Sequence, residues 1–295
     1  MSATGRDRMG SEAVASSRGE VGGRGLDRWW VHLTLVIGVI VIVYPLSWAV
    51  MAALRTTPDL QSYPPSFLPR EWTPSKFVAA WEFAPLGRFI VNSIVQAGTI
   101  TLGQIVTASL AAYAFARLQF RGRDLLFLIV LATMMIPIQV IMIPLFALVS
   151  GFGWANTYAG LTVPFLAHAF SIFLLRQFFL TVPRELEEAA MIDGASRLRF
   201  LITILLPIAR PALGAVTIFT FVYHWNTYLW PLIITSATEM RTVQPGLAMY
   251  IEREAGTDFG RLMAASIIIA LPTLVPFLVA QRQFIKGVTL SGVKG

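Results

Sequence analysis

Four of the sixteen acidic residues of this chain are clustered in one internal segment. Glu185, Glu187, Glu188 and Asp193 lie within nine residues of one another, in a chain that is 56% hydrophobic and 13% charged. Soluble domains carry about 25% charged residues, so such a cluster is unusual in so apolar a sequence. Carboxylates at this density could pair with charges at the rim of a contact with another protein.

The remaining polar groups argue against an enzyme. The 295 residues include no cysteine, so a thiol nucleophile and a cysteine metal site are both excluded. The three histidines, His32, His168 and His224, are far apart and lack the spacing of zinc ligands. No G-x-x-x-x-G-K-[ST] sequence is present to cradle ATP phosphates. We therefore expect no catalytic residue and no metal site. Any step that requires energy would draw it from a partner protein or from an ion gradient.

Long stretches without Asp, Glu, Lys or Arg indicate that lipid surrounds much of the chain. They cover residues 29–54, 89–116, 125–175, 211–238 and 262–281. A helix needs about 20 residues to cross a bilayer, so the 51-residue stretch 125–175 must hold two spans. Its break is expected at SGFGWANTY, Ser150–Tyr158. The sequence predicts an all-α membrane protein with six transmembrane helices in residues 26–284, kinked at Pro137, Pro144, Pro164, Pro272 and Pro276.

The basic residues predict the orientation of the helices. With a cytoplasmic N-terminus, 16 of the 23 Lys and Arg residues fall on the inside and 7 on the outside, as the positive-inside rule requires. Both termini and the acidic cluster are then cytoplasmic. Residues 1–25, rich in Gly, Ser and Arg, predict a disordered tail, and residues 285–295 a second tail. The proline-rich connection 55–88 predicts an external loop and not a seventh span.

The acidic cluster belongs to a predicted short helix, and we call residues 183–207 the acidic segment. Pro183 suits the first position of a helix, and the glutamates that follow complement the helix dipole. Gly194 ends the helix, and Ser196 can cap a second helix that continues into the fifth span. From physical features alone, a helix that touches lipid headgroups is as good an interpretation as a surface for a partner protein, although the negative leaflet disfavours three carboxylates.

One pattern in the acidic segment favours the partner. Glu188-Ala189-Ala190, Gly194, Ile204, Leu206 and Pro207 match E-A-A-x3-G-x9-I-x-L-P without a departure. This pattern resembles the EAA loop of bacterial ABC-importer permeases. AAYAFAR (Ala111–Arg117) and the tail QRQFIKGVTLSGVKG (Gln281–Gly295) are similar to those of the maltose-type carbohydrate permeases, and more narrowly to the second of the two paired permeases. The resemblance covers the chain from about residue 26 to the C-terminus.

The resemblance implies the fold, the partners and the location. The fold would be the type I ABC-importer permease bundle in the bacterial inner membrane. The partners would be a homologous second permease, a dimer of ABC ATPases that binds ATP and Mg, and an external sugar-binding protein, with no nucleic acid. Glu188, Ala190 and Gly194 would sit at the surface that docks into the ATPase. The coupling role would extend to Ala189, Asp193, Ile204, Leu206 and Pro207, and the C-terminal tail either reaches the ATPase or is solvated.

The residues of the transport path are predicted from polar and aromatic side chains near the outer ends of the spans. Trp225 and Tyr228 could stack on sugar rings, and His224 and Asn226 could bind hydroxyl groups. The competing interpretation is an interfacial aromatic belt, in which Trp and Tyr are enriched without any ligand. Asn92 and Gln96 raise the same question, because small polar residues in spans often join helices.

The sequence therefore predicts the permease subunit of an ATP-driven, binding-protein-dependent importer of sugars or oligosaccharides. An importer of sn-glycerol-3-phosphate has the same architecture and is similar around Trp225–Thr235. A proton-coupled carrier is the alternative from another class, but such carriers usually have charged residues within their spans, and here the spans can be drawn with none.

Overall fold

A 32-residue helix, α4 (Leu86–Arg117), organises the chain from Ala52 onward in the computed structural model. The structure describes residues 26–64, 66–251 and 256–274. The two predicted tails lie outside the described residues, and so does the end of the predicted sixth span. The described residues are helical, with no strand assigned among them.

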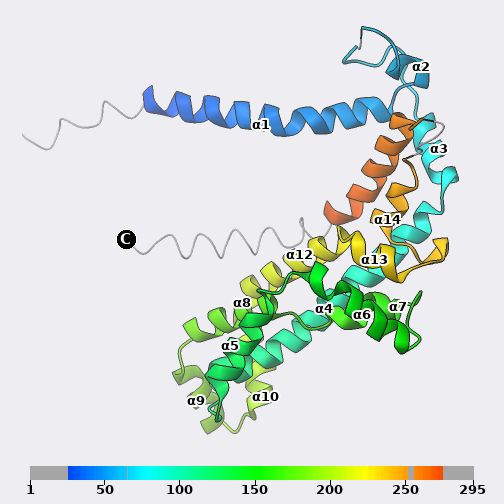
Figure 1. The fold of residues 1–295 in the computed structure, drawn as a ribbon. Helices are drawn as coiled ribbons and strands as arrows, with labels where there is room; N and C mark the ends of the chain where they lie inside the picture. Colours follow the sequence, from blue (N-terminus) through cyan, green and yellow to red (C-terminus); the bar gives the residue numbers. More distant parts are fainter. Residues whose placement is uncertain (1–25, 65, 252–255, 275–295) are drawn as a thin grey trace, which may run out of the picture. The chain divides into compact units, whose positions relative to one another are not determined.

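α4 packs against α8 (Ala169–Thr181) and α12 (Arg210–Trp225), which lie beside it in Figure 1. The side chains that α4 buries are mostly small or polar. Ala97, Ala108, Ala112 and Ala116 among them are at most 2% exposed. Small residues let helix backbones approach closely in lipid. Gly103, also on α4, lets Leu166 at the end of the 3-10 turn Val163–Phe165 approach closely, because a Cβ built there would lie 3.2 Å from the Cβ of Leu166.

The helices before and after α4 have the following bounds. Preceding it are α1 (Leu26–Ala53), α2 (Thr57–Leu60) and α3 (Ser75–Phe83). After it come α5 (Arg123–Thr133), α6 (Ile138–Gly151), α7 (Tyr158–Thr162) with the 3-10 turn Val163–Phe165, and α8. The chain continues through α9 (Glu185–Ile192), α10 (Arg197–Phe200), the π-helical turn Leu201–Leu205, α11 (Leu206–Ile208) and α12. It goes on with α13 (Leu229–Ile234), the 3-10 turn Thr238–Met240, α14 (Val243–Ala248) and the helix Phe259–Leu274.

The apolar stretches form helices, but several of these helices are bent or broken. Among the described residues, two helices are long and apolar enough to cross a membrane alone, Trp29–Ala53 and Leu86–Arg117. Three more spans result if each bent helix pair counts as one: α5 with α6 at 95°, α7 with α8 at 41°, and α10–α11 with α12 at 80°. The described part of the sixth predicted span is the shorter apolar helix Phe259–Leu274. The exact number of six therefore stays a prediction.

Prolines lie at the two sharpest bends, and a glycine-rich connection separates α6 from α7. The predicted break at Ser150–Tyr158 is confirmed, because α6 ends at Gly151 and α7 begins at Tyr158. The 95° bend lies at Pro137, whose extended backbone (ψ 132°) starts α6. Pro211 at the start of α12 lacks the amide hydrogen that would continue α11. The helix that Ser196 caps was expected to continue into the fifth span; in the structure an 80° bend separates Arg197–Ile208 from α12.

The residues up to Met51, which include most of α1, form a unit separate from the rest of the chain. The apolar side chains of α1 from Trp29 to Val50 are largely exposed. A helix that is apolar on all sides is typical of a segment that lipid or another protein covers. In the connection from Arg55 to Pro85, the longest helix is α3 with nine residues. Because nine residues cannot cross a bilayer, no seventh span lies here among the described residues.

An ion pair ties this connection to the last described helix. Lys76 Nζ lies 2.6 Å from Asp258 Oδ2 and 2.5 Å from Thr57 Oγ1, and the two charged side chains are 10% and 26% exposed. Burial raises the pKa of Asp258, but hydrogen bonds from Lys76 and from the backbone N–H of Arg261 outweigh it and hold the pKa below the usual 3.8. The ionised pair therefore stabilises the fold.

We expect Asp258→Asn to lower the free energy of unfolding by about 1–3 kcal/mol at pH 7, because Lys76 loses its charged partner in a partly buried site. Since the folded pKa lies below the unfolded one, this stabilisation is complete above pH of about 4 and disappears as the pH falls through the folded value. Thermal unfolding in detergent, followed by tryptophan fluorescence, measures the difference. Asp124→Asn is the control, because that carboxylate is 78% exposed; equal losses in both variants would contradict the prediction.

Candidate functional site

The acidic segment starts with α9, whose two ends are set by local sequence. Glu185, Glu187 and Glu188 occupy its first turn, where carboxylates complement the helix dipole. Arg184 is the N-cap, so Pro183 lies before the helix and not at its first position as expected.

The end of α9 follows the prediction. Gly194 has φ of +80°, and the amides of Gly194 and Ala195 donate to the carbonyls of Met191 and Ala190 at 3.0 and 2.9 Å. These are the two hydrogen bonds of a Schellman motif. A Cβ at Gly194 would meet nothing within 4 Å, so the backbone conformation, and not lack of space, requires glycine.

The residues of the E-A-A motif divide between a surface and the interior. Glu188, Ala189, Asp193 and Gly194 are exposed, whereas Ala190 is 6% exposed and packs in the main core cluster. The resemblance implied that Ala190 lies at the docking surface, and the structure instead uses it to seat α9 on the body. Next to the exposed set, Ile192 exposes 86% of its surface. We call the exposed surface formed by Glu188, Ala189, Ile192, Asp193 and Gly194 the free face of α9. It consists of an apolar side chain, that of Ile192, with carboxylates beside it.

The second half of the acidic segment packs α9 against the helix that follows. Ser196 caps α10 as predicted, with its Oγ accepting from Arg199 N at 3.3 Å. Ile204 and Leu206 are half-buried against the main core cluster, and Pro207 is exposed. These three motif residues lie at the π-helical turn and the start of α11, just before the 80° bend.

A polar contact that the sequence did not predict joins α9 to the end of α4. Tyr113 OH donates to Glu187 Oε1 at 2.7 Å, and Arg117 Nη1 lies 3.9 Å from Glu187 Oε2. Arg117 Nη2 also donates to the carbonyls of Phe179 and Val182, at the end of α8, at 2.7 and 2.6 Å. We call Tyr113, Arg117 and Glu187 the α4–α9 clamp. The one available signal was that Tyr113 and Arg117 lie four residues apart, on one face of a helix.

Closer to the N-terminal end of α4, the side chain of Gln104 connects this helix to three other elements: the 3-10 turn Val163–Phe165, α8 and α12. Its Nε2 donates to the Phe165 carbonyl at 2.9 Å, and its Oε1 accepts from Ser171 Oγ on α8 at 2.7 Å and from Thr220 Oγ1 on α12 at 3.0 Å. The side chain is 2% exposed. Buried polar groups in an apolar medium need such partners, so Gln104 fixes the positions of α8 and α12 around α4.

Gln104, Ser171 and Thr220 also line a cavity of about 680 Å³. A second cavity of about 470 Å³ shares five of its lining residues, so the two adjoin, and we call them together the central cavity. Its size is typical of ligand pockets. The shared residues are Ile138, Phe165, Val222, Tyr223 and His224.

The six predicted path residues divide evenly. His224, Asn226 and Tyr228 line the central cavity. The Asn226 side chain is held in place because its Nδ2 donates to the Val222 carbonyl at 2.8 Å. Tyr228 is 40% exposed. His224 is 6% exposed, and its Nδ1 has no hydrogen-bond partner among the described residues.

The other three predicted path residues pack inside the protein. Trp225 is 1% exposed and stacks on Phe221. Asn92 is fully buried and joins segments, since its Nδ2 donates to the carbonyls of Glu239 and Arg241 and its Oδ1 accepts from Tyr158. Gln96 is 1% exposed, and its amide has no hydrogen-bond partner in the described part of the chain. Among the described residues, no group of three His, Cys, Asp or Glu side chains is placed to hold a metal ion.

Comparisons with known proteins agree with this architecture. Residues 104–289 match the family model described as the binding-protein-dependent transport system inner membrane component. The chain is 37% identical over 271 residues to the sn-glycerol-3-phosphate transport system permease protein UgpE of Yersinia enterocolitica, which covers 90% of this chain and 96% of that one. It is 36% identical over 263 residues to the protein of the same name from Escherichia coli, with 87% and 94% covered.

Solved structures agree on the fold. A bacterial ABC transporter involved in the import of the acidic polysaccharide alginate includes a chain that matches with a TM-score of 0.78 at 22% identity, covering 88% of this chain and 98% of that one. A bacterial alginate ABC transporter in complex with an alginate pentasaccharide-bound periplasmic protein matches with a TM-score of 0.61 at 17% identity, covering 86% and 94%. The expected membership is confirmed: the chain belongs to the binding-protein-dependent transport system inner membrane components, the multi-pass permeases of bacterial ABC importers.

Proposed function

We propose that this chain is one of the two membrane-spanning halves of an ATP-driven importer, and that it carries sugars or oligosaccharides which an external binding protein delivers. A homologous permease completes the pathway. A dimer of ABC ATPases binds ATP and Mg on the cytoplasmic side, and the chain itself supplies the pathway and the mechanical connection without a cofactor of its own.

The strongest support is an unbroken series of contacts from the acidic segment to the central cavity. Glu187 on α9 contacts Tyr113 and Arg117 on α4, and Gln104 on α4 contacts α8 and α12, whose side chains line the cavity. Polar contacts between helices are directional, so a displacement of α9 is expected to move α4 and the cavity walls with it.

The free face of α9 suits a cleft on the ATPase. Ile192 would lose its 86% exposure on docking, and burying such a side chain contributes about 1.5–3 kcal/mol. Glu188 and Asp193 at the edge would pair with basic residues of the partner, and Ala189 and Gly194 present no bulky side chain. When ATP closes the ATPase dimer, the two docked helices would move together, and the bundle would change from inward-facing to outward-facing.

The cavity lining favours an uncharged, hydroxyl-rich substrate. Phe165, Tyr223 and Tyr228 offer ring faces, and His224 and Asn226 offer hydrogen bonds. No Lys or Arg is among the described residues that line it. A second candidate substrate is sn-glycerol-3-phosphate, which the names of the two relatives favour. Helix N-termini or the second permease would then supply the positive charge.

The docking role predicts that Glu188→Lys lowers the amount of ATPase that co-purifies with the permease by at least about tenfold, because it reverses a charge at the edge of the contact. Gly194→Val should act in the same direction, since a left-handed conformation costs a side chain about 1–2 kcal/mol. Quantitative co-purification measures this, with insertion checked in membranes. Glu71→Lys, the same charge reversal in the predicted external loop, is the control; undiminished ATPase in the Glu188 variant would refute the docking role.

The clamp predicts a different phenotype. Tyr113→Phe and Glu187→Ala should keep the ATPase bound while the substrate transported per ATP hydrolysed falls about threefold to tenfold, because a hydrogen bond of about 0.5–1.5 kcal/mol no longer fixes α9 to α4. Transport and ATP hydrolysis are measured together in proteoliposomes. Tyr63→Phe is the matched control, since Tyr63 is 94% exposed. An unchanged transport-to-ATP ratio in both clamp variants would rule out transmission through this contact.

The central cavity predicts that His224→Leu slows transport about threefold to tenfold at saturating binding protein, by removing one hydrogen-bonding group, while ATPase binding is unchanged. His32→Leu on α1 is the control. Uptake of labelled neutral sugars and of sn-glycerol-3-phosphate, each with the cognate binding protein, decides between the substrates. Uptake that survives ATP depletion but stops when the proton gradient is collapsed would instead indicate a proton-coupled carrier.

A further inference from the structure

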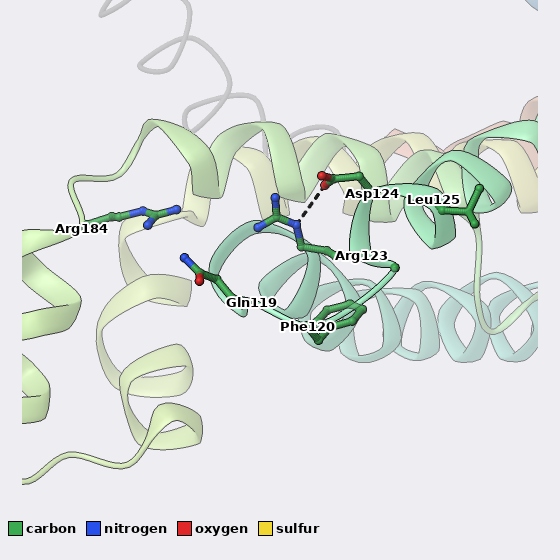
Figure 2. Close-up of a pocket in the computed structure, with 7 residues that line it drawn as sticks. Gln119, Phe120, Arg123, Asp124, Leu125 and Arg184 are labelled. Carbon is green, nitrogen blue, oxygen red and sulfur yellow. Dashed lines mark hydrogen bonds and ion pairs between the residues drawn. The ribbon is translucent and has the colours of Figure 1, made fainter.

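A basic notch lies where α4 turns into α5, outside both the free face of α9 and the central cavity. It has a volume of about 450 Å³ and is lined by Gln119, Phe120, Gly122, Arg123, Asp124, Leu125 and Arg184. Figure 2 shows the side chains of Arg123 and Arg184 extending toward one another, with the Gln119 amide near the gap between them. Two guanidinium groups and an amide from two separate connections thus face one hollow.

The one carboxylate of the notch does not fill it. Asp124 accepts from Arg123 Nε at 3.0 Å, and its side chain is 78% exposed. In Figure 2 it lies on the far side of Arg123 from Arg184. Arg123, with five donors on its guanidinium, keeps others for a second acceptor. The notch therefore has positive character and unused donors that suit a phosphate group.

The surface next to the notch is strongly apolar. Leu125, Leu126, Leu128 and Ile129 on α5 expose 63%, 48%, 62% and 53% of their surfaces. This exposed run begins at the notch itself, because Leu125 belongs to both. A small water-soluble anion would gain nothing from this apolar surface, whereas a phospholipid has both a phosphate and acyl chains.

The position along the chain agrees with the depth of a headgroup. The notch lies between the end of the membrane-crossing helix α4 and the start of the apolar α5, within the charged connection from Arg117 to Arg123. Basic pockets at such boundaries bind lipid headgroups, and the cytoplasmic leaflet is the negatively charged one.

We propose that the notch is a binding site for an anionic phospholipid, whose phosphate lies between Arg123 and Arg184 and whose acyl chains lie along the exposed face of α5. The assignment to the cytoplasmic leaflet rests on the proposed orientation, but the binding itself does not. Because Arg184 directly precedes α9, the lipid would occupy the base of the acidic segment without covering its free face.

The test uses the permease purified with its partner subunits and placed in nanodiscs of mixed phosphatidylglycerol and phosphatidylcholine. Native mass spectrometry counts the lipids that remain bound after gentle delipidation. We expect retained phosphatidylglycerol to exceed phosphatidylcholine, and Arg123→Gln or Arg184→Gln each to reduce this excess about fivefold. Arg199→Gln, the same change on the exposed α10, should leave it unaltered.

Two further arms distinguish a lipid site from a structural role of Arg184 and from a site for free anions. Arg184→Lys keeps the charge and should retain most of the excess; a loss as large as in Arg184→Gln would overturn the proposal, because it would indicate a structural role. Inorganic phosphate in large excess should not displace the lipid, and full displacement would show a site for free anions. An equal loss in the Arg199→Gln control would also overturn it, since the attraction would then be general. Transport is not measured, so these outcomes are independent of the substrate.

Discussion

The close packing of α4 with α8 and α12 is the constraint on which the rest of this structure depends. In a membrane the hydrophobic effect does not drive helices together, so association relies on tight packing and on polar contacts between helices. Here both come from α4, where alanines bring the backbones close and Gln104 binds a serine of α8 and a threonine of α12. The cavity exists because these helices are held at defined positions around it.

The residues of α9 and its C-terminal end are divided between the interior of the protein and its surface. Glu187 turns inward to Tyr113 and Arg117, and Ala190 packs in the core. Glu188 and Asp193 remain outside beside the exposed Ile192. The same short helix is thus attached to the body by one side and free to bind on the other. The carboxylates of this segment therefore differ in their surroundings: Glu187 holds the helix in place, whereas Glu188 and Asp193 are exposed.

Local features were predictable from the sequence, and long-range ones were not. The apolar stretches follow from the cost of charge in lipid. The C-terminal end of α9 follows from Gly194, and the N-terminal end of α10 follows from Ser196. A proline marks where a helix can bend, but the 95° at Pro137 depends on packing with other helices. The clamp joins residues 74 positions apart, and no periodicity shows such a contact. For the same reason, Asn92 and Trp225 seemed to be path residues although they are buried.

The contact between Gly103 and Leu166 limits how the bundle can rearrange. The leucine side chain occupies the space that a Cβ of residue 103 would need, so it is seated in a gap in the surface of α4. Sliding the 3-10 turn along α4 by one helical turn, about 5.4 Å, would first require lifting this side chain out against the neighbouring residues. Thr107 Oγ1 and Gln104 Nε2 also donate to the carbonyls of Leu166 and Phe165, so hydrogen bonds and packing hold the turn at the same place on α4. A shift of register between these two elements would therefore break all three contacts at once.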